Sequence, residues 1–183
     1  MSNETSYRLG PTMKLTIGLQ FLCLVVSFQA SATNERDTIL ELARQTIEKS
    51  RYATFVTVDD KGQPRTRIVD PFIPDDEFVI YVATKPNTRK VIQIEDHTAV
   101  TLFYFDAEGR NYVSVMGQAE LLRDKATKRQ MRRAADSDKI YPNFPNDYLL
   151  IKIHPRRVEG LLPGYRGDPH DWRPIGVDFL GEK

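Results

Sequence analysis

The stretch YVATKPNTRKVIQIEDHTAV, residues 81–100, contains the end of one strand, a turn, a short helix and the beginning of another strand. The apolar, β-branched run before Pro86 predicts the first strand, and Thr88 stands where a helix N-cap belongs. The helix is predicted over residues 88–97. Its inward face is predicted to carry Val91, Ile92 and Ile94. Because a helix this short is more typical of an element that flanks a sheet, the stretch favours a mainly β fold.

Three cations gather around this turn, namely Lys85, Arg89 and Lys90. A helix start offers unpaired backbone N–H groups and the positive end of the helix dipole, so it is suited to an anion. Arginine can hold a phosphate through two parallel hydrogen bonds, while lysine acts as a point charge. Cations in a first helical turn oppose the dipole unless an anion compensates. The segment is therefore interpreted in two ways, as a phosphate site or as a solvated helix start.

Short segments typical of strands lie on both sides of this stretch. The turn DDKG at residues 59–62 predicts a hairpin, because Gly62 can take a positive φ. The predicted strands are residues 52–58, 63–73, 78–84, 99–106, 111–122, 147–155 and 156–162. Gly117, inside the fifth of these, predicts a bulge or a close backbone approach. The pattern predicts a mainly β (α+β) fold, an antiparallel barrel of six or seven strands with short flanking helices.

Two further helices and a tail complete the predicted chain. Residues 37–50 predict an amphipathic helix with Asp37 as its N-cap. Its inward face is predicted to carry Ile39, Leu42, Ala43 and Ile47. Residues 124–137 predict a charged and largely solvated helix, and the Gly- and Pro-rich residues 163–183 predict an irregular tail. We therefore expect one domain, residues 33–162, followed by that tail.

The segment PRTRIVD, residues 64–70, places Arg65 and Arg67 on one face of a predicted strand, because side chains alternate with period two. Cations on a barrel strand are costly to bury without a partner. The two arginines therefore either face water or meet the helix-start cations around one phosphate.

The N-terminal residues have the composition of a targeting segment. Lys14 precedes the uncharged run at residues 15–28, and Ala30 and Ala32 fit the small residues of a signal-peptidase site. The run is short for a membrane span, which needs about 20 apolar residues. We expect residues 1–32 to be a cleaved signal peptide, with either Met1 or Met13 as its start. The mature protein is then expected to be secreted or periplasmic, with no stable membrane anchor after cleavage. An uncleaved anchor and a buried core helix are the alternatives.

Charge and cysteine content exclude several function classes. With 26 basic and 25 acidic residues, the chain lacks the basic excess of a protein that coats nucleic acid, and we expect no nucleic-acid partner. Cys23, the only cysteine, lies within the predicted signal peptide, so no disulfide or cysteine-based metal site is expected after cleavage. His170, between Asp168 and Asp171, lacks a second cluster of metal ligands, and we predict no metal site.

Four segments in order resemble the FMN-binding split-barrel family related to pyridoxamine 5′-phosphate oxidase. They are YATFVTVDDKGQPRTRIVD, FVIYVATKPNTRKVIQIEDH, the AVTLFYF strand that follows, and VMGQAELL. The resemblance covers roughly residues 39–162, and its most specific parts are residues 84–90 and the strand containing Arg65. It implies a split barrel and a homodimer with two FMN molecules in clefts between the subunits.

The resemblance also implies roles for individual residues. The strand with Arg65, Thr66, Arg67 and Ile68 would lie along the flavin, with Arg65 reaching the phosphate. Ala83 and Thr84 would touch the ring system, and Thr88, Arg89 and Lys90 would close on the phosphate. Asn111 or Tyr112 would contact the ring or the ribityl chain. Trp172 would either cover the flavin or plug the barrel.

Two departures from the family pattern narrow the expected activity. Asp70 stands where the family's oxidases carry a lysine, and a carboxylate cannot donate to a flavin carbonyl. The tail past Trp172 offers only Arg173, where those oxidases have a basic tail with a histidine that grips the substrate phosphate. The chain therefore resembles the general-stress-protein-like branch, and we expect an FMN-dependent oxidoreductase acting on a small-molecule substrate or electron donor. The alternative is a secreted, non-enzymatic binding protein that has lost flavin or binds haem. No catalytic side chain can be named from the sequence.

Overall fold

The computed structural model describes residues 35–179 and opens in a helix at residues 35–50. Ile39, Ala43 and Ile47 are buried, which confirms the predicted inward face. Asp37 lies inside this helix and is not its N-cap, so that prediction was wrong. The predicted signal peptide lies outside the described residues. Within the described part of the chain, no helix has the length and apolar character that a membrane span requires.

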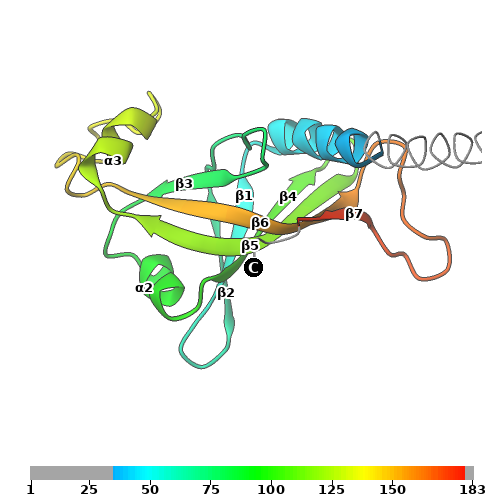
Figure 1. The fold of residues 1–183 in the computed structure, drawn as a ribbon, viewed down its shortest axis with the longest axis horizontal. Helices are drawn as coiled ribbons and strands as arrows, with labels where there is room; N and C mark the ends of the chain where they lie inside the picture. Colours follow the sequence, from blue (N-terminus) through cyan, green and yellow to red (C-terminus); the bar gives the residue numbers. More distant parts are fainter. Residues whose placement is uncertain (1–34, 180–183) are drawn as a thin grey trace, which may run out of the picture. The chain divides into compact units, whose positions relative to one another are not determined.

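Seven antiparallel strands form one sheet, and two labelled helices flank it (Figure 1). The strands are β1 (Ala53–Val58), β2 (Pro64–Val69), β3 (Ile80–Thr84), β4 (Ala99–Asp106), β5 (Asn111–Leu122), β6 (Leu149–Leu161) and β7 (Ile175–Asp178). The helices are α2 (Arg89–Asp96) and α3 (Lys125–Met131). The strand order is β2-β1-β4-β5-β6-β3, with β7 paired to β6. This arrangement confirms the predicted barrel class with short flanking helices.

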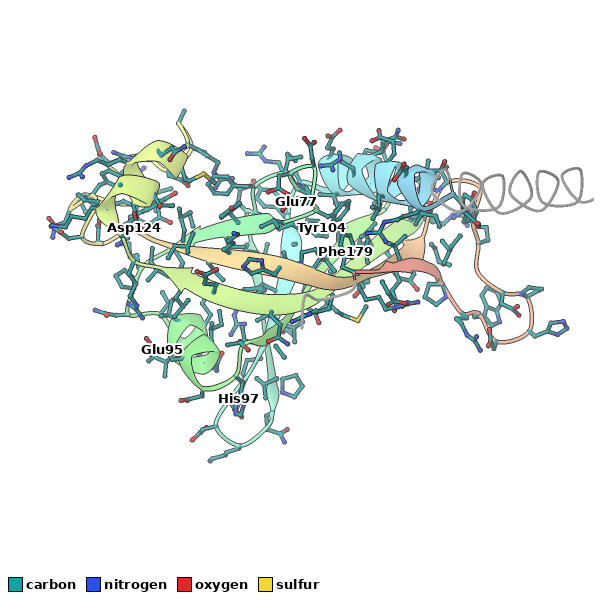
Figure 2. The ribbon with its side chains drawn as sticks, in the orientation of Figure 1. Glu77, Glu95, His97, Tyr104, Asp124 and Phe179 are labelled. Atoms are coloured by element: carbon teal, nitrogen blue, oxygen red, sulfur yellow. The ribbon has the colours of Figure 1, made fainter. Side chains whose placement is uncertain are left out.

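Alternation along the strands separates an inner face from an outer one. In β1 every second residue is buried, and its inward Phe55 faces Leu102 of β4 and Arg67 of β2 in the strand register. Tyr104 of β4, labelled in Figure 2, is fully buried, and burial raises the pKa of its hydroxyl. Each large apolar side chain buried in this way contributes about 1.5–3 kcal/mol to folding. The inner face is therefore the core, and the outer face stays accessible.

Strand β6 is longer than predicted, because residues 149–161 form one strand and not two. The sequence suggested a break at Pro155, since proline has no N–H to donate to a ladder. In the structure Pro155 lies opposite Gly117, where the register of β5 shifts by a bulge. A Cβ on Gly117 would lie 2.4 Å from the carbonyl oxygen of His154, so the bulge requires a glycine. The predicted bulge is confirmed, and it allows Pro155 to lie within a continuous strand.

Three local predictions differ from the structure. Ile92 is 55% exposed, because the narrow buried stripe of α2 includes only Val91 and Ile94. Helix α3 ends at Met131, well before residue 137. Residues 175–178 of the predicted irregular tail form β7, which an ion pair between Arg157 and Asp178 ties to β6.

A second, smaller apolar cluster is formed around the buried residues Tyr141, Tyr148 and Leu150. Arg133 links the loop after α3 to the chain that follows β2. The guanidinium of Arg133 donates to the backbone oxygens of Asp70 and Pro71, each at 3.2 Å. It also donates to both carboxylate oxygens of Asp136 at 3.1 and 3.2 Å, and Asp136 is 4% exposed. Tyr148 donates to the same carboxylate at 3.0 Å. One arginine therefore anchors the chain after β2 to the loop after α3.

Candidate anion-binding site

Arg67 of β2 is held at the edge of the inner face by neutral oxygens. Its Nη1 donates to Thr57 Oγ1 at 2.6 Å and to the backbone oxygens of Arg65 and Phe55 at 2.8 and 3.2 Å. Its Nη2 donates to Gln93 Oε1 at 3.0 Å, which links β2 to α2. The register pairs Arg67 with the buried Phe55, so the guanidinium lies over the core side of the sheet. The guanidinium is partly buried there, and none of these four acceptors neutralises its positive charge.

Lys90, in the first turn of α2, is the second cation of the site. Its Nζ donates to Thr84 Oγ1 at 2.8 Å and to Thr88 Oγ1 at 3.4 Å. Burial, and after it the nearby charge of Arg67, lowers the pKa of Lys90. Thr84 is buried at the end of β3. Lys90 therefore lies between the end of β3 and the start of α2, within the electrostatic reach of Arg67.

Arg89 adds a third charge at the same place. Burial, and after it the charge of Arg89, lowers the pKa of Arg67, so the two positive charges repel each other across this site. Among residues 35–179, no carboxylate forms an ion pair with Arg67, Arg89 or Lys90. We name these three residues the cation cluster. Figure 2 labels Glu95 and His97, which belong to the opposite, C-terminal end of α2. The cluster thus concentrates positive charge that its surroundings do not neutralise.

Arg65 lies on the same face of β2 as Arg67 but is not part of the cluster. Its Nε and Nη2 contact Asp59 Oδ2 at 2.8 and 2.7 Å. The other oxygen of Asp59 accepts from the backbone N–H groups of Lys61 and Gln63 in the β1–β2 turn. The bond from Gln63 is the main cause of the lowered pKa of Asp59, and Arg65 adds to it. The arginine expected to reach a phosphate from this strand is therefore held by a carboxylate, and Arg67 takes the central place.

At the start of α2 the N–H groups of Val91 and Ile92 donate to the oxygen of Thr88, and those of Arg89 and Lys90 have no acceptor among the described residues. Thr88 is the N-cap residue, yet its side chain makes no capping hydrogen bond and donates to the oxygen of Lys85 at 3.1 Å. A helix start without a side-chain cap has unpaired N–H groups that an anion can satisfy. Thr88 and the first-turn cations therefore offer both charge and hydrogen-bond donors.

A family model described as pyridoxamine 5′-phosphate oxidase matches residues 39–162. The chain belongs to the pyridoxamine 5′-phosphate oxidase family. The matched range contains every residue of the cation cluster, and it confirms the resemblance found in the sequence. No curated protein matches the chain.

Solved structures of the same fold include three informative neighbours. General Stress Protein 26 from Bacillus anthracis is 23% identical, with a TM-score of 0.59, covering 76% of this chain and 97% of that one. A pyridoxamine 5′-phosphate oxidase-related, FMN-binding protein from Nostoc punctiforme is 14% identical, with a TM-score of 0.56, covering 80% and 96%. A haem-binding protein from Mycobacterium smegmatis is 16% identical, with a TM-score of 0.55, covering 75% and 57%. At these identities the likeness establishes the split-barrel fold.

The other residues expected from the pyridoxamine 5′-phosphate oxidase family pattern are distributed over four places. Thr66 and Ile68 lie on the outer face of β2, where Ile68 is 67% exposed. Ala83 packs against the smaller apolar cluster. The structure thus brings Thr84, Thr88, Arg89 and Lys90 together with Arg67, and it directs Thr66, Ile68 and Ala83 elsewhere.

Asn111 and Tyr112 begin β5, away from the cation cluster. The register places Arg67 level with Val115, so Asn111 lies four residues, roughly 13 Å, further along the strand. Asn111 is buried, donates to Asp106 and accepts from Arg166, which gives it a structural role in the β4–β5 turn. Tyr112 points to the outer face and stacks on Phe103 with ring centroids 5.4 Å apart.

Trp172 lies in the loop between β6 and β7 and is 74% exposed, so it does not plug the barrel. It has a positive φ of 58°, and its N–H donates to the oxygen of Asp168 at 2.9 Å. Asp168 also accepts from the N–H groups of His170 and Asp171. The loop is therefore ordered by its own hydrogen bonds and presents an exposed indole.

Sequence reasoning missed Thr57, Gln93 and Asp59, which decide how the arginines of β2 are held. Thr57 is buried because it occupies an inward position of β1, and its pairing with Arg65 could have been deduced from the hairpin register. Gln93 follows Arg89 by one helical turn, so helix periodicity places it on the cation side. Asp59 begins the predicted turn. Each of these local signals was present in the sequence. The hydrogen bonds themselves join different strands and helices, so the sequence alone did not reveal them.

Proposed function

We propose that this chain is an exported, FMN-binding oxidoreductase and that the cation cluster holds the cofactor's phosphate. The observation that carries the proposal is the convergence of Arg67, Arg89 and Lys90, without a carboxylate partner in the described part of the chain, at an uncapped helix start. Two of these cations are partly buried, and their attraction for an anion is stronger there than in water. Export rests on the sequence of residues 1–32 alone.

The residues of the cluster suit a terminal phosphate in charge and in donors. Arg67 and Arg89 can each offer paired N–H groups, while Lys90 and the free N–H groups of α2 approach from the helix side. A bound FMN supplies the hydride chemistry, and the protein supplies binding, orientation and electrostatics. By fixing the phosphate between β2 and α2, these residues would set where the ring lies relative to the sheet. The substrate remains a small molecule of unspecified class.

We further propose that a second copy of the chain covers the outer face of the sheet. The face carries Ile68 of β2 and Phe103 and Phe105 of β4, which are 67%, 36% and 57% exposed. A groove of about 340 Å³ between β1, β4 and β5 continues it and is lined mostly by apolar side chains, among them Val56 and Met116. Exposed apolar patches of this kind mark interaction sites. Membership of the family favours a homodimer as the occupant.

Ile68→Lys should convert the dimer to a monomer at micromolar concentration, because it buries an unpaired charge within the proposed contact. Light scattering measures the mass directly. Ile92→Lys is the matched control, since Ile92 is equally apolar and 55% exposed on α2. A wild-type protein with the mass of one chain would rule out the dimer.

A second candidate function is a binding protein without flavin chemistry, with haem as its ligand. Asp70 favours it, because Arg133 already engages both the backbone oxygen and, at 3.8 Å, the carboxylate of this residue. The end of β2 therefore offers no donor for a flavin ring. The similarity to the haem-binding protein from Mycobacterium smegmatis supports this second candidate.

Comparison of FMN with riboflavin tests the proposed function. The two flavins share a ring system, and only FMN carries the phosphate. The wild-type protein should therefore bind FMN at least about tenfold more tightly than riboflavin, because riboflavin lacks the charged hydrogen bonds to the phosphate and one such bond is worth about that factor. The preference should decline as the pH rises toward the pKa of Lys90, which lies below its ordinary value of 10.5, because the neutral amine no longer attracts phosphate. Fluorescence quenching measures both affinities. Equal affinities would overturn the proposal, and a Soret band in the purified protein would favour haem.

A further inference from the structure

Gln93 connects α2 to β1 and to β2, the strand that carries Arg67 of the cation cluster. Its Oε1 accepts a hydrogen bond from Thr57 Oγ1 at 2.6 Å and another from Arg67 Nη2 at 3.0 Å. An arginine can only donate, so the amide must direct its oxygen toward Arg67. The side chain is partly buried, and its contacts span residues far apart in the sequence. Gln93 is therefore placed to fix the direction of the Arg67 guanidinium.

Arg67 differs from three other partly buried arginines in the chemistry of its acceptors, and it shares neutral acceptors with Arg44, which donates to the backbone oxygens of Pro74 and Asp75. Arg132, Arg133 and Arg157 each form an ion pair with a carboxylate. Exposed Arg65, two residues from Arg67 on the same strand face, is held by Asp59 in the same way. Arg67 has four acceptors, and all of them are neutral. Such acceptors hold a guanidinium in place without cancelling its charge.

We propose that Gln93 is a positioning residue that sets the charge selectivity of the site. It orients Arg67 toward a phosphate and, because it is an amide, leaves the full positive charge available to that phosphate. A glutamate at this position would keep the geometry but neutralise Arg67 and repel the anion. The proposal rests on the proposed function, since it takes the cation cluster as the phosphate site. It adds the residue that allows the cluster to stay positive.

Two substitutions separate the charge of residue 93 from its geometry. Gln93→Glu keeps the size and the acceptor but adds a negative charge, so FMN affinity should fall about tenfold or more while riboflavin affinity stays unchanged. The same variant should raise the melting temperature of the flavin-free protein, because it gains an ion pair with Arg67. Gln93→Met keeps the length but removes the acceptor, so FMN affinity should fall several-fold and the melting temperature should decrease. Gln130→Glu adds the same charge on the exposed face of α3 and is the control for net charge.

The outcomes distinguish this proposal from the proposed function. If the wild-type protein prefers FMN and Gln93→Glu binds it equally well, the positioning role is overturned and the phosphate site stands. If Gln93→Glu weakens FMN and riboflavin by the same factor, the role of Gln93 is only structural and the proposal fails. If the wild-type protein shows no preference for FMN, the proposed function fails, and inorganic phosphate becomes the probe. Phosphate should then raise the melting temperature of the wild-type protein and not that of Gln93→Glu; equal shifts, or none in either protein, would overturn the role of Gln93.

Discussion

Replacing Arg133 with methionine should lower the free energy of unfolding by about 3–5 kcal/mol, because a buried carboxylate loses its cation. Asp136 is 4% exposed, and Arg133 is the only positive charge that pairs with it among the described residues. The substitution also removes the hydrogen bonds to the backbone oxygens of Asp70 and Pro71. Urea denaturation followed by circular dichroism measures the change. A loss of this size would leave a protein at the lower end of the usual stability range, about 5 kcal/mol, barely folded.

Arg129→Met provides the matched control, since Arg129 lies on the exposed side of α3. Substitutions at such surface positions usually change stability by no more than about 0.5 kcal/mol. Asp136→Asn, combined with Arg133→Met, should recover part of the loss, because an amide is less costly to bury than an unpaired carboxylate. A loss below about 1 kcal/mol in Arg133→Met alone would contradict the role assigned to this arginine.

Arg67→Ala should weaken FMN binding by about ten- to a hundredfold and leave riboflavin binding nearly unchanged. The removal of one charged hydrogen-bonding partner costs about 1.5–3 kcal/mol, which corresponds to that factor in affinity. The salt dependence of FMN binding should also become weaker, since screening acts on the charges that remain. Fluorescence titration of both flavins at low and high salt measures all of these effects.

Two other cations act as controls for the position of the phosphate. Lys85 lies in the turn before α2 with an exposed side chain, so Lys85→Ala should change FMN affinity much less. Arg65 is held by Asp59, and Arg65→Ala should also have a smaller effect than Arg67→Ala. If Arg65→Ala proves the more damaging of the two arginine substitutions, the phosphate lies nearer the β1–β2 turn than the cluster indicates.

Most of the fold could be predicted because its signals are local. Alternating burial along most of β5 follows from its alternation of smaller apolar and polar residues, whereas β1 buries Thr57 and turns Val56 and Val58 outward. Ile92 was misassigned because three apolar residues in four positions do not reveal which edge of the helical stripe is buried. Strand β7 was missed because two apolar residues within a Gly- and Pro-rich tail are too weak a pattern. Its pairing depends on β6, and no local signal reports it.

The candidate site was predictable only in part. Period-two alternation placed Arg65 and Arg67 on one face, and helix-start chemistry identified Arg89 and Lys90. The sequence could not show which of the two arginines pairs with a carboxylate, because that depends on Asp59, whose side chain accepts from Arg65. Ion pairing between elements is a property of the folded chain. The structure therefore favours Arg67 over Arg65 as the arginine of the candidate site.

Strand β2 ends the strand order of the sheet, so one of its backbone edges has no neighbouring strand among the described residues. A bare edge can accept a strand from another molecule, which is a common first step toward aggregation. Pro64 lacks the N–H that such pairing requires, and the uncompensated charge of Arg67 would meet a like charge if a second β2 approached. This protection requires no bound ligand. Arg67 therefore favours solubility at a vulnerable edge, whichever cofactor the protein carries.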